Sequence, residues 1–258
     1  MTQNQLDSLS KVDLSIQLLR EHQPRQDYYL AFSGGKDSIL IYDLARRAGS
    51  RFQAYYHSSP IDPPMMPRFI RENYPDVIFE KPTEKFWEVF LRKGPPYRNR
   101  RWCCDLIKER YGKGRLVVTG RRSEESSNRS KALFIDTAWN DPNQDILNPI
   151  LLWSKEEVWD YIHSRHLPYP DLYDKGFKRI GCIMCPMASS EQRWKEYSYF
   201  HRTGLIWEYY FDKLYELKRD KYEATWISGH DMFLWWMAPY QPKVSDLQLR
   251  LFEEEDDV

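Results

Sequence analysis

The feature that most constrains the fold is an alternation of short apolar runs with helical patterns between residues 28 and 119. Apolar runs predict strands at residues 28–32, 52–56, 77–80 and 115–119. Helical spacing predicts helices at residues 37–47, 67–74, 83–91 and 103–111. Strands separated by helices are typical of parallel sheets. We therefore expect a doubly wound, mostly parallel α/β sheet.

The two ends of the chain read as helical. Residues 6–22 predict an N-terminal helix, and Ser154 followed by Glu157 forms a capping box before a helix that ends near Ser164. Residues 189–222 are helical in pattern and rich in aromatic side chains, and residues 253–257 form an acidic tail. The sequence thus predicts an α/β domain at residues 1–188 and a helical extension at residues 189–258.

Charge and hydropathy limit the classes of partner. The chain has 38 basic and 38 acidic side chains, so a nucleic acid would need basic residues gathered on one face. The longest apolar cluster, residues 232–239, is far shorter than the ~20 residues that cross a bilayer. Because the N-terminal residues also show no secretory signal pattern, we expect a cytoplasmic protein without a membrane partner.

A polar turn lies between the first predicted strand and the helix that follows it. It reads Ser33-Gly34-Gly35-Lys36-Asp37-Ser38. Glycines let backbone N–H groups approach an anion, a helix N-terminus adds partial positive charge, and Lys36 adds a full charge. The spacing is neither the dinucleotide fingerprint nor the Walker pattern. The alternative is a tight structural turn in which Ser33 and Asp37 cap the helix.

The four cysteines fall into two close pairs, Cys103-Cys104 and Cys182/Cys185. Four thiolates are the ligand count of a [4Fe–4S] cluster or of a tetrahedral zinc ion. Grouped cysteines in a reducing compartment favour a metal over structural disulfides. Buried structural cysteines remain the third interpretation.

Two further features each have a structural explanation beside a functional one. His57 follows the second strand, where a nucleotide base or ribose lies in a doubly wound sheet, but a satisfied surface histidine is the commoner explanation. The aromatic residues of the C-terminal extension could stack nucleic-acid bases, whereas a helix core or an oligomer interface is the commoner reason for such a pattern.

The turn at residues 33–38 resembles the SGGxDS loop of the PP-loop superfamily, the adenine-nucleotide alpha hydrolases. In that superfamily the loop grips pyrophosphate and attack falls on the α-phosphate. The resemblance implies an ATP site in which Ser33, Gly34, Gly35, Lys36, Asp37 and Ser38 contact the nucleotide, with Mg²⁺ neutralising its charge and Asp37 either orienting the metal or capping the helix.

Residues 28–186 also resemble assimilatory adenylylsulfate reductases. The segment "RWCCDLIKER" matches their CC-x3-K pattern, which with CxxC ligates a [4Fe–4S] cluster and places Lys108 near it. The segment "VVTGRRSEESSNR" resembles their arginine-bearing loop and implies nucleotide contacts from Gly120, Arg121, Arg122 and Arg129. Guanidinium groups at a strand's carboxyl end suit phosphate oxygens. The alternative is a solvated basic loop paired with Glu124 and Glu125.

The sequence departs from the reductases in one respect: it carries no cysteine after Cys185, where those enzymes use a further thiol as nucleophile. An intact loop with a cluster motif and no such cysteine resembles the ATP pyrophosphatases of DNA phosphorothioation. That resemblance implies adenylation of a DNA phosphate for sulfur insertion, with a cysteine desulfurase as sulfur donor. Lys108 and Arg122 would then stabilise charge at the α-phosphate.

Two other functions remain open on the sequence. The first is a reductase of an adenylylated sulfate that borrows a thiol from a partner. The second is a nucleotide-binding regulator without catalytic activity, whose four cysteines hold a structural zinc ion.

Overall fold

The computed structural model describes residues 10–109, 112–126, 129–138 and 141–239, except the side chains of residues 108 and 109. The chain divides into two compact units. The first comprises Met1–Ser58, Pro64–Lys81 and Glu109–Ile180, and the second comprises Ser59–Pro63, Pro82–Lys108 and Gly181–Val258. The domain boundary expected between residues 188 and 189 stays a prediction. The second unit contains the C-terminal helices together with earlier segments of the chain.

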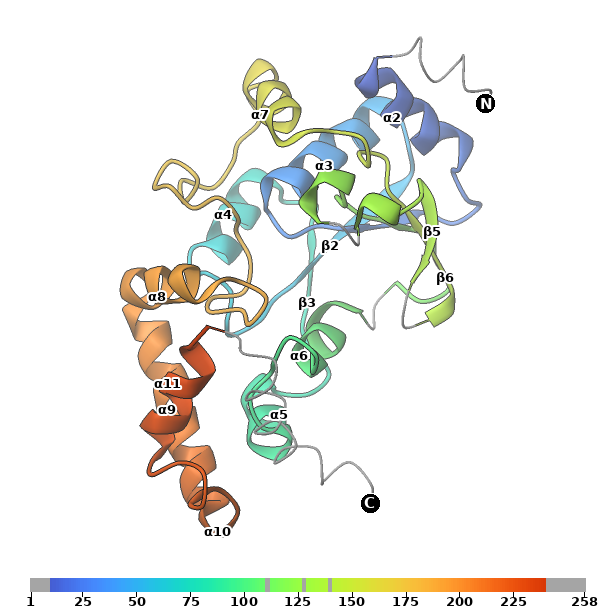
Figure 1. Cartoon of the computed structure of the whole chain (residues 1–258). Coiled ribbons are helices and arrows are strands. Elements are labelled where there is room, and N and C mark those ends of the chain that lie inside the picture. Colours follow the sequence, from blue (N-terminus) through green and yellow to red (C-terminus); the bar gives the residue numbers. More distant parts are fainter. Residues whose placement is uncertain (1–9, 110–111, 127–128, 139–140, 240–258) are drawn as a thin grey trace. The chain divides into compact units, whose positions relative to one another are not determined.

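A six-stranded sheet forms the centre of the first unit (Figure 1). Its strand order is β3-β2-β1-β4-β6-β5, and all neighbouring pairs are parallel except β5 and β6. The strands are β1 (Tyr28–Ala31), β2 (Phe52–His57), β3 (Ile78–Glu80), β4 (Val117–Val118), β5 (Ile135–Ala138) and β6 (Asp141–Leu147). The predicted mostly parallel α/β fold is confirmed.

The strand order reverses beside β1. The chain runs outward from β1 to β2 and β3, and then returns to pair β4 with the other side of β1. Loops that leave two neighbouring parallel strands in opposite directions open a crevice at their carboxyl ends, and ligands of α/β sheets bind there. In this chain the two loops are residues 32–35 after β1 and residues 119–122 after β4.

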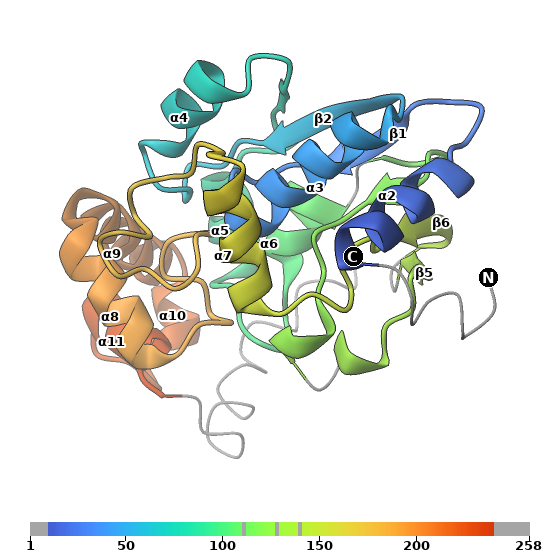
Figure 2. The same ribbon diagram turned by 90° about the horizontal axis from the view of Figure 1, so that it is seen from above.

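Four helices of the first unit share a hydrophobic core with one side of the sheet (Figure 2). They are α2 (Lys11–Glu21), α3 (Lys36–Ala48), α4 (Met66–Asn73) and α7 (Lys155–Ser164). Alternate strand residues such as Tyr28 and Leu30 of β1 face this core and are fully buried. The predicted capping box is present, because Ser154 Oγ accepts the Glu157 amide at 3.1 Å and Glu157 Oε2 accepts the Ser154 amide at 2.7 Å. The helix ends at Ser164, as expected.

The described part of the second unit is helical. Its helices are α5 (Phe86–Lys93), α6 (Trp102–Cys104), α8 (Ser190–Tyr199), α9 (His201–Leu217), α10 (Arg219–Tyr222) and α11 (Gly229–Met237). Trp207 of α9 contacts Phe86 edge-on, with ring centroids 5.6 Å apart, and stacks on Trp236, with ring centroids 4.7 Å apart. The aromatic pattern therefore builds a helix core at these positions, although Tyr209 is 58% exposed.

Several elements differ from expectation. Residues 103–111 do not form one α-helix: α6 ends at Cys104 and a π-helix follows at Asp105–Glu109. The sequence did not predict β5 or β6, and it covered α11 only as part of the helical extension expected at residues 189–258. Residues 6–9 of the expected first helix, residues 110–111 and the acidic tail lie outside the described residues. None of the helices in the described ranges is long and apolar enough to span a lipid bilayer.

Candidate active site

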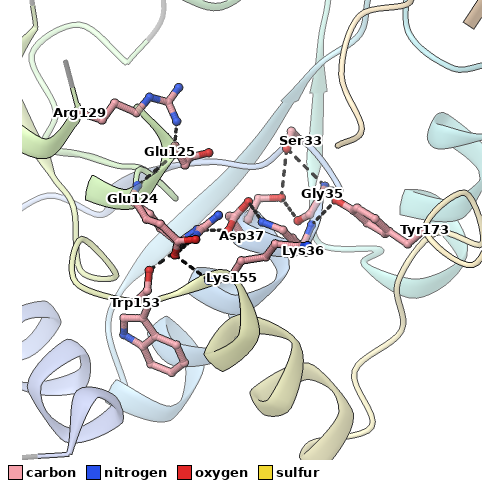
Figure 3. A network of polar contacts seen from close by, with 12 residues as sticks. Ser33, Gly35, Lys36, Asp37, Glu124, Glu125, Arg129, Trp153, Lys155 and Tyr173 are labelled. Carbon is pink, nitrogen blue, oxygen red and sulfur yellow. Dashed lines mark hydrogen bonds and ion pairs between the residues drawn. The ribbon is translucent and has the colours of Figure 1, made fainter. Parts of the chain in front are cut away.

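The polar turn between β1 and α3 is held by its own hydroxyl groups (Figure 3). Gly35 is the N-cap of α3, its amide donates to Ser33 Oγ at 3.3 Å, and Ser38 Oγ donates to the Gly35 carbonyl at 2.8 Å. Gly34 adopts a left-handed φ of 71°, and a Cβ there would lie 2.6 Å from Met66 Cε. The turn therefore requires glycine at position 34 and places both serine hydroxyls beside the first turn of α3.

Two buried cations meet one carboxylate at this turn. Lys36 Nζ lies 2.6 Å from Asp37 Oδ2, and Arg122 Nε lies 2.8 Å from Asp37 Oδ1. Lys36 and Arg122 are each only 5% exposed. Burial lowers the pKa of the Lys36 ammonium and nearby Arg122 adds to this, while the Asp37 carboxylate raises it. Lys36 and Arg122 thus present two buried cationic groups that suit an oxyanion.

The loop after β4 reaches the same turn. A Cβ on Gly120 would lie 3.0 Å from the carbonyl carbon and Cβ of Asp37, so a larger residue there would crowd the backbone of Asp37. The Arg122 guanidinium also donates to Glu124 Oε2 at 3.2 Å and to the Trp153 carbonyl at 3.4 Å. The reversal of strand order thus brings Gly120 and Arg122 to the turn, as their predicted roles require.

The other two arginines of this loop pair with acidic side chains. Arg121 Nη1 lies 3.2 Å from Asp136 Oδ2 on β5, and Arg129 forms an ion pair with Glu125. The described contacts do not bring Arg121 or Arg129 to the turn, so their predicted nucleotide contacts stay predictions. Pairing with the loop's own glutamates occurs at Arg129, with Glu125, and also at Arg122, with Glu124.

Tyr173 is a residue of the site that sequence reasoning missed. The backbone amide of Lys36 donates to Tyr173 Oη at 3.0 Å, across 137 positions of sequence (Figure 3). Burial raises the pKa of Tyr173, so the phenol is protonated at neutral pH. No short motif contains Tyr173, which lies in the turn-rich segment before Cys182.

His57 lies among polar partners within the sheet and is not on the surface. Its side chain is 9% exposed, its Nε2 lies 2.6 Å from Tyr29 Oη, and its Nδ1 lies 3.5 Å from Glu80 Oε2. Tyr29 Oη also donates to Glu80 Oε2 at 2.9 Å. These contacts give His57 a structural explanation within the sheet.

All four cysteines belong to the second unit and are free of disulfides. A hydrogen bond with Cys104, burial, and the charges of Cys104, Cys182 and Cys185 all raise the pKa of the Cys103 thiol. Groups of both cysteine pairs therefore act on the Cys103 thiol. Among the described residues, however, no group of three or more His, Cys, Asp or Glu side chains is arranged to hold a metal ion. Metal ligation stays a prediction, as does the role of Lys108, whose side chain lies outside the described residues.

Comparison with known families decides the classification. Residues 27–188 match the model of the phosphoadenosine phosphosulfate reductase domain, which is more than half of the chain. The chain belongs to this family. The family match confirms the predicted relationship to PP-loop and sulfonucleotide-reductase proteins, whereas the finer resemblance to DNA phosphorothioation enzymes stays a prediction.

Similar proteins include reductases and proteins without a known role. An uncharacterised protein of Methanocaldococcus jannaschii is 30% identical over 98% of this chain and 62% of its own length. An adenosine 5'-phosphosulfate reductase of Geobacillus is 26% identical over 69% of this chain and 81% of its own length. The chain spans 62% and 40% of the lengths of two archaeal relatives, which are thus longer proteins.

Solved structures share the fold of the family. The phosphoadenylyl-sulfate reductase of Candida auris, in a phosphate complex, aligns with a TM-score of 0.53 and 20% identity over 70% of this chain and 96% of its own. The FMN adenylyltransferase of Candida glabrata, bound to FMN and the ATP analogue AMPCPP, aligns with a TM-score of 0.50 and 16% identity. That alignment covers 67% of this chain and 63% of the transferase chain.

Proposed function

We propose that this chain is an ATP pyrophosphatase that adenylates an oxyanion acceptor. The observation that carries the proposal is the pair of buried cations, Lys36 and Arg122, held by Asp37 at the carboxyl end of β1. Buried positive charge beside a helix N-terminus binds phosphate oxygens strongly. ATP carries three phosphates, whereas adenylylsulfate carries one phosphate joined to sulfate as an anhydride. ATP therefore offers more phosphate oxygens to these cations, and this site favours ATP.

The turn would hold the β- and γ-phosphates. The Ser33 and Ser38 hydroxyls lie 3.3 Å apart beside the Gly35 amide, and all three groups can donate to a phosphate oxygen. Phosphate oxygens would also replace Asp37 as partners of Lys36 and Arg122. Stronger contacts as charge develops on the leaving pyrophosphate would accelerate the reaction.

The reaction is a displacement at the α-phosphorus of ATP. An acceptor oxygen forms a bond to this phosphorus, and the bond from phosphorus to the bridging α–β oxygen breaks. The bridging oxygen leaves with the electron pair as part of pyrophosphate, and the product is an acceptor adenylate. Lys36 and Arg122 stabilise the charge that accumulates on the leaving group.

Magnesium would arrive with the nucleotide. In the described residues of the turn, Asp37 supplies a carboxylate, and each of its oxygens already contacts a cation. Mg²⁺ in phosphate-transfer sites is held largely by phosphate oxygens and water. The turn by itself therefore does not fit a resident magnesium ion.

The four thiols fit an iron–sulfur cluster in the chemistry of their donor atoms. Cys103, Cys104, Cys182 and Cys185 would hold a [4Fe–4S] cluster once their protons leave, and such a cluster supplies sulfur or redox chemistry when bound. For the acceptor we propose a nucleic-acid phosphate, in DNA, with a cysteine desulfurase as sulfur donor. The resemblance of the loop and cysteine motifs to DNA phosphorothioation enzymes supports this acceptor.

Reduction of adenylylated sulfate is a second candidate. The observation in its favour is that several similar proteins are named adenosine 5'-phosphosulfate reductases, at 26–30% identity in Geobacillus and Pseudomonas aeruginosa. Within these 258 residues, a cluster on all four cysteines leaves no thiol to act as nucleophile. This activity would need a thiol from a partner.

The test is pyrophosphate release from ATP by anaerobically purified protein with Mg²⁺. We expect Lys36→Ala to lower the rate by at least about 100-fold, because it removes a charge at the leaving group. Lys155→Ala is the matched control, since Lys155 is exposed and only its backbone contacts Glu124. Equal rates in wild type and Lys36→Ala would contradict the proposal, and sulfite release from adenylylsulfate without pyrophosphate release would favour the reductase.

A further inference from the structure

Tyr173 is fixed over the turn by the segment that follows α7. Its amide donates to the Pro170 carbonyl at 3.2 Å, and the Gly176 amide donates to the Tyr173 carbonyl at 3.0 Å. Its ring packs edge-on against Trp159 of α7, with ring centroids 4.8 Å apart. The segment thus forms two tight turns that point the phenol at the N-terminus of α3.

The phenol oxygen occupies a position that an anion would use. The Lys36 amide belongs to the first turn of α3, where backbone N–H groups have no partner within the helix. Such amides are the groups that bind phosphate at a helix N-terminus. In this structure the Lys36 amide donates to Tyr173 Oη, and a Cβ on Gly35 would lie 3.3 Å from the same oxygen. A phosphate oxygen and the Tyr173 hydroxyl cannot both accept from this amide at that position.

We propose that Tyr173 is a gate on the pyrophosphate subsite, whose hydroxyl must leave the Lys36 amide before the β- or γ-phosphate binds. This inference rests on the proposed function, because it assigns that subsite to the turn. The exchange is favourable for a pyrophosphate, since an amide bonds a charged oxygen more strongly than a phenol. A nucleotide without β- and γ-phosphates gains nothing from opening the gate. Tyr173 therefore lowers the affinity of the site for nucleotides that carry β- and γ-phosphates and leaves the affinity for AMP unchanged.

The Tyr173→Phe variant isolates the hydroxyl. Phenylalanine keeps the ring packing against Trp159 but frees the Lys36 amide, so pyrophosphate no longer displaces a protein group. We expect inorganic pyrophosphate to bind about fivefold more tightly, the net worth of one hydrogen bond. AMP affinity should change less than twofold. Titration calorimetry with each probe measures both values.

Tyr169→Phe is the matched control. Tyr169 lies in the same segment, but its hydroxyl donates to Asp174 at 3.3 Å and does not reach the turn. This variant should bind pyrophosphate as the wild type does. Hydrogen exchange at the Lys36 amide gives a second readout: exchange should be faster in Tyr173→Phe and should slow again when pyrophosphate is added.

The outcomes separate this inference from the proposed function. In one outcome the wild type binds pyrophosphate and Lys36→Ala does not, but Tyr173→Phe binds it no more tightly than the wild type. This result overturns the gate and leaves the proposed function standing. Absence of pyrophosphate binding in all variants, or binding that survives Lys36→Ala, overturns the assignment of the subsite and the gate with it. Tighter binding in Tyr173→Phe that disappears in the double variant with Lys36→Ala supports both.

Discussion

Asp37 lies between two buried cations, and at the residue scale this determines how the turn responds to an anion. Its carboxylate pairs with both Lys36 and Arg122, so removal of its charge takes the ion-pair partner at 2.6 Å from Lys36 and leaves Arg122 paired with Glu124. An entering phosphate supplies the same negative charge. Asp37 therefore stabilises the protein without ligand and competes with the ligand for the same partners.

Asp37→Asn should lower the free energy of unfolding by about 2 kcal/mol, less than for a fully buried pair because the Asp37 side chain is 23% exposed. Added pyrophosphate should then raise the melting temperature of the variant more than that of the wild type, since the anion restores the missing charge. Thermal unfolding with and without pyrophosphate measures both effects.

Asp43→Asn is the matched control for this prediction. Asp43 also lies on α3 and is 14% exposed, but it accepts from Tyr161 Oη at 2.6 Å and pairs with Arg165. Its loss should destabilise the protein without increasing the effect of pyrophosphate. An equal pyrophosphate effect in Asp37→Asn and in the wild type would show that the anion does not meet Lys36 and Arg122.

At the scale of elements, the start of α7 is linked to α2 by charge. Glu157 accepts from the Ser154 amide and from Lys11 Nζ, each at 2.7 Å. Partial burial raises the pKa of Glu157, but the contacts with Lys11 and Ser154 outweigh it and leave the pKa below the usual value. A carboxyl with a lowered pKa in the folded state stabilises above its unfolded pKa, and this contribution is lost as the pH falls through the folded pKa.

Glu157→Gln should therefore cost about 0.5–1 kcal/mol near neutral pH, in line with an N-terminal cap and a half-exposed ion pair. The difference from wild type should shrink as the pH falls below about 4, where the wild-type carboxyl becomes neutral. Urea unfolding at both pH values tests this. Glu156→Gln, at an exposed neighbouring position, should show no such convergence. A difference that does not change with pH would contradict the role of charge.

Elements with a clear period or cap were predictable, and those without one were not. The strands β1 and β2 follow from apolar runs, and α7 follows from its capping box. The β5–β6 hairpin was missed because β5 is an edge strand with exposed and half-buried positions, and Asp141 and Pro142 begin β6 without an apolar run. Helix α11 is short and apolar on most sides, so its residues gave no helical period.

The site was predictable in so far as it is local in sequence. The glycines and serines of the turn belong to one motif, and Arg122 belongs to a second. The position of Tyr173 depends on how a turn-rich segment folds back over α3, a long-range contact that no spacing rule encodes. The pairing of Arg121 with Asp136 likewise required the unpredicted strand β5.

At the scale of the whole molecule, the two proposed chemistries belong to different units. The turn and Arg122 lie in the first unit, and all four cysteines lie in the second. The cysteine pairs come from segments of the second unit that are distant in sequence. A metal that joins them would close a long loop and so would stabilise this unit specifically.

Anaerobic reconstitution with iron and sulfide should raise the melting temperature of the second unit by more than about 10 °C, because metal–thiolate bonds contribute several kcal/mol to folding. Tryptophan fluorescence reports mainly on this unit, which contains Trp87, Trp102, Trp194, Trp207, Trp226, Trp235 and Trp236. The double variant Cys182→Ser/Cys185→Ser should show no increase in melting temperature, whereas Asp43→Asn, in the first unit, should keep the increase.

Broad visible absorption would accompany an iron–sulfur cluster. The same increase in melting temperature with zinc alone and no colour would mean a structural zinc ion. An unchanged melting temperature in the wild type with both metals would exclude metal binding by these cysteines and leave the adenylation proposal to rest on the first unit.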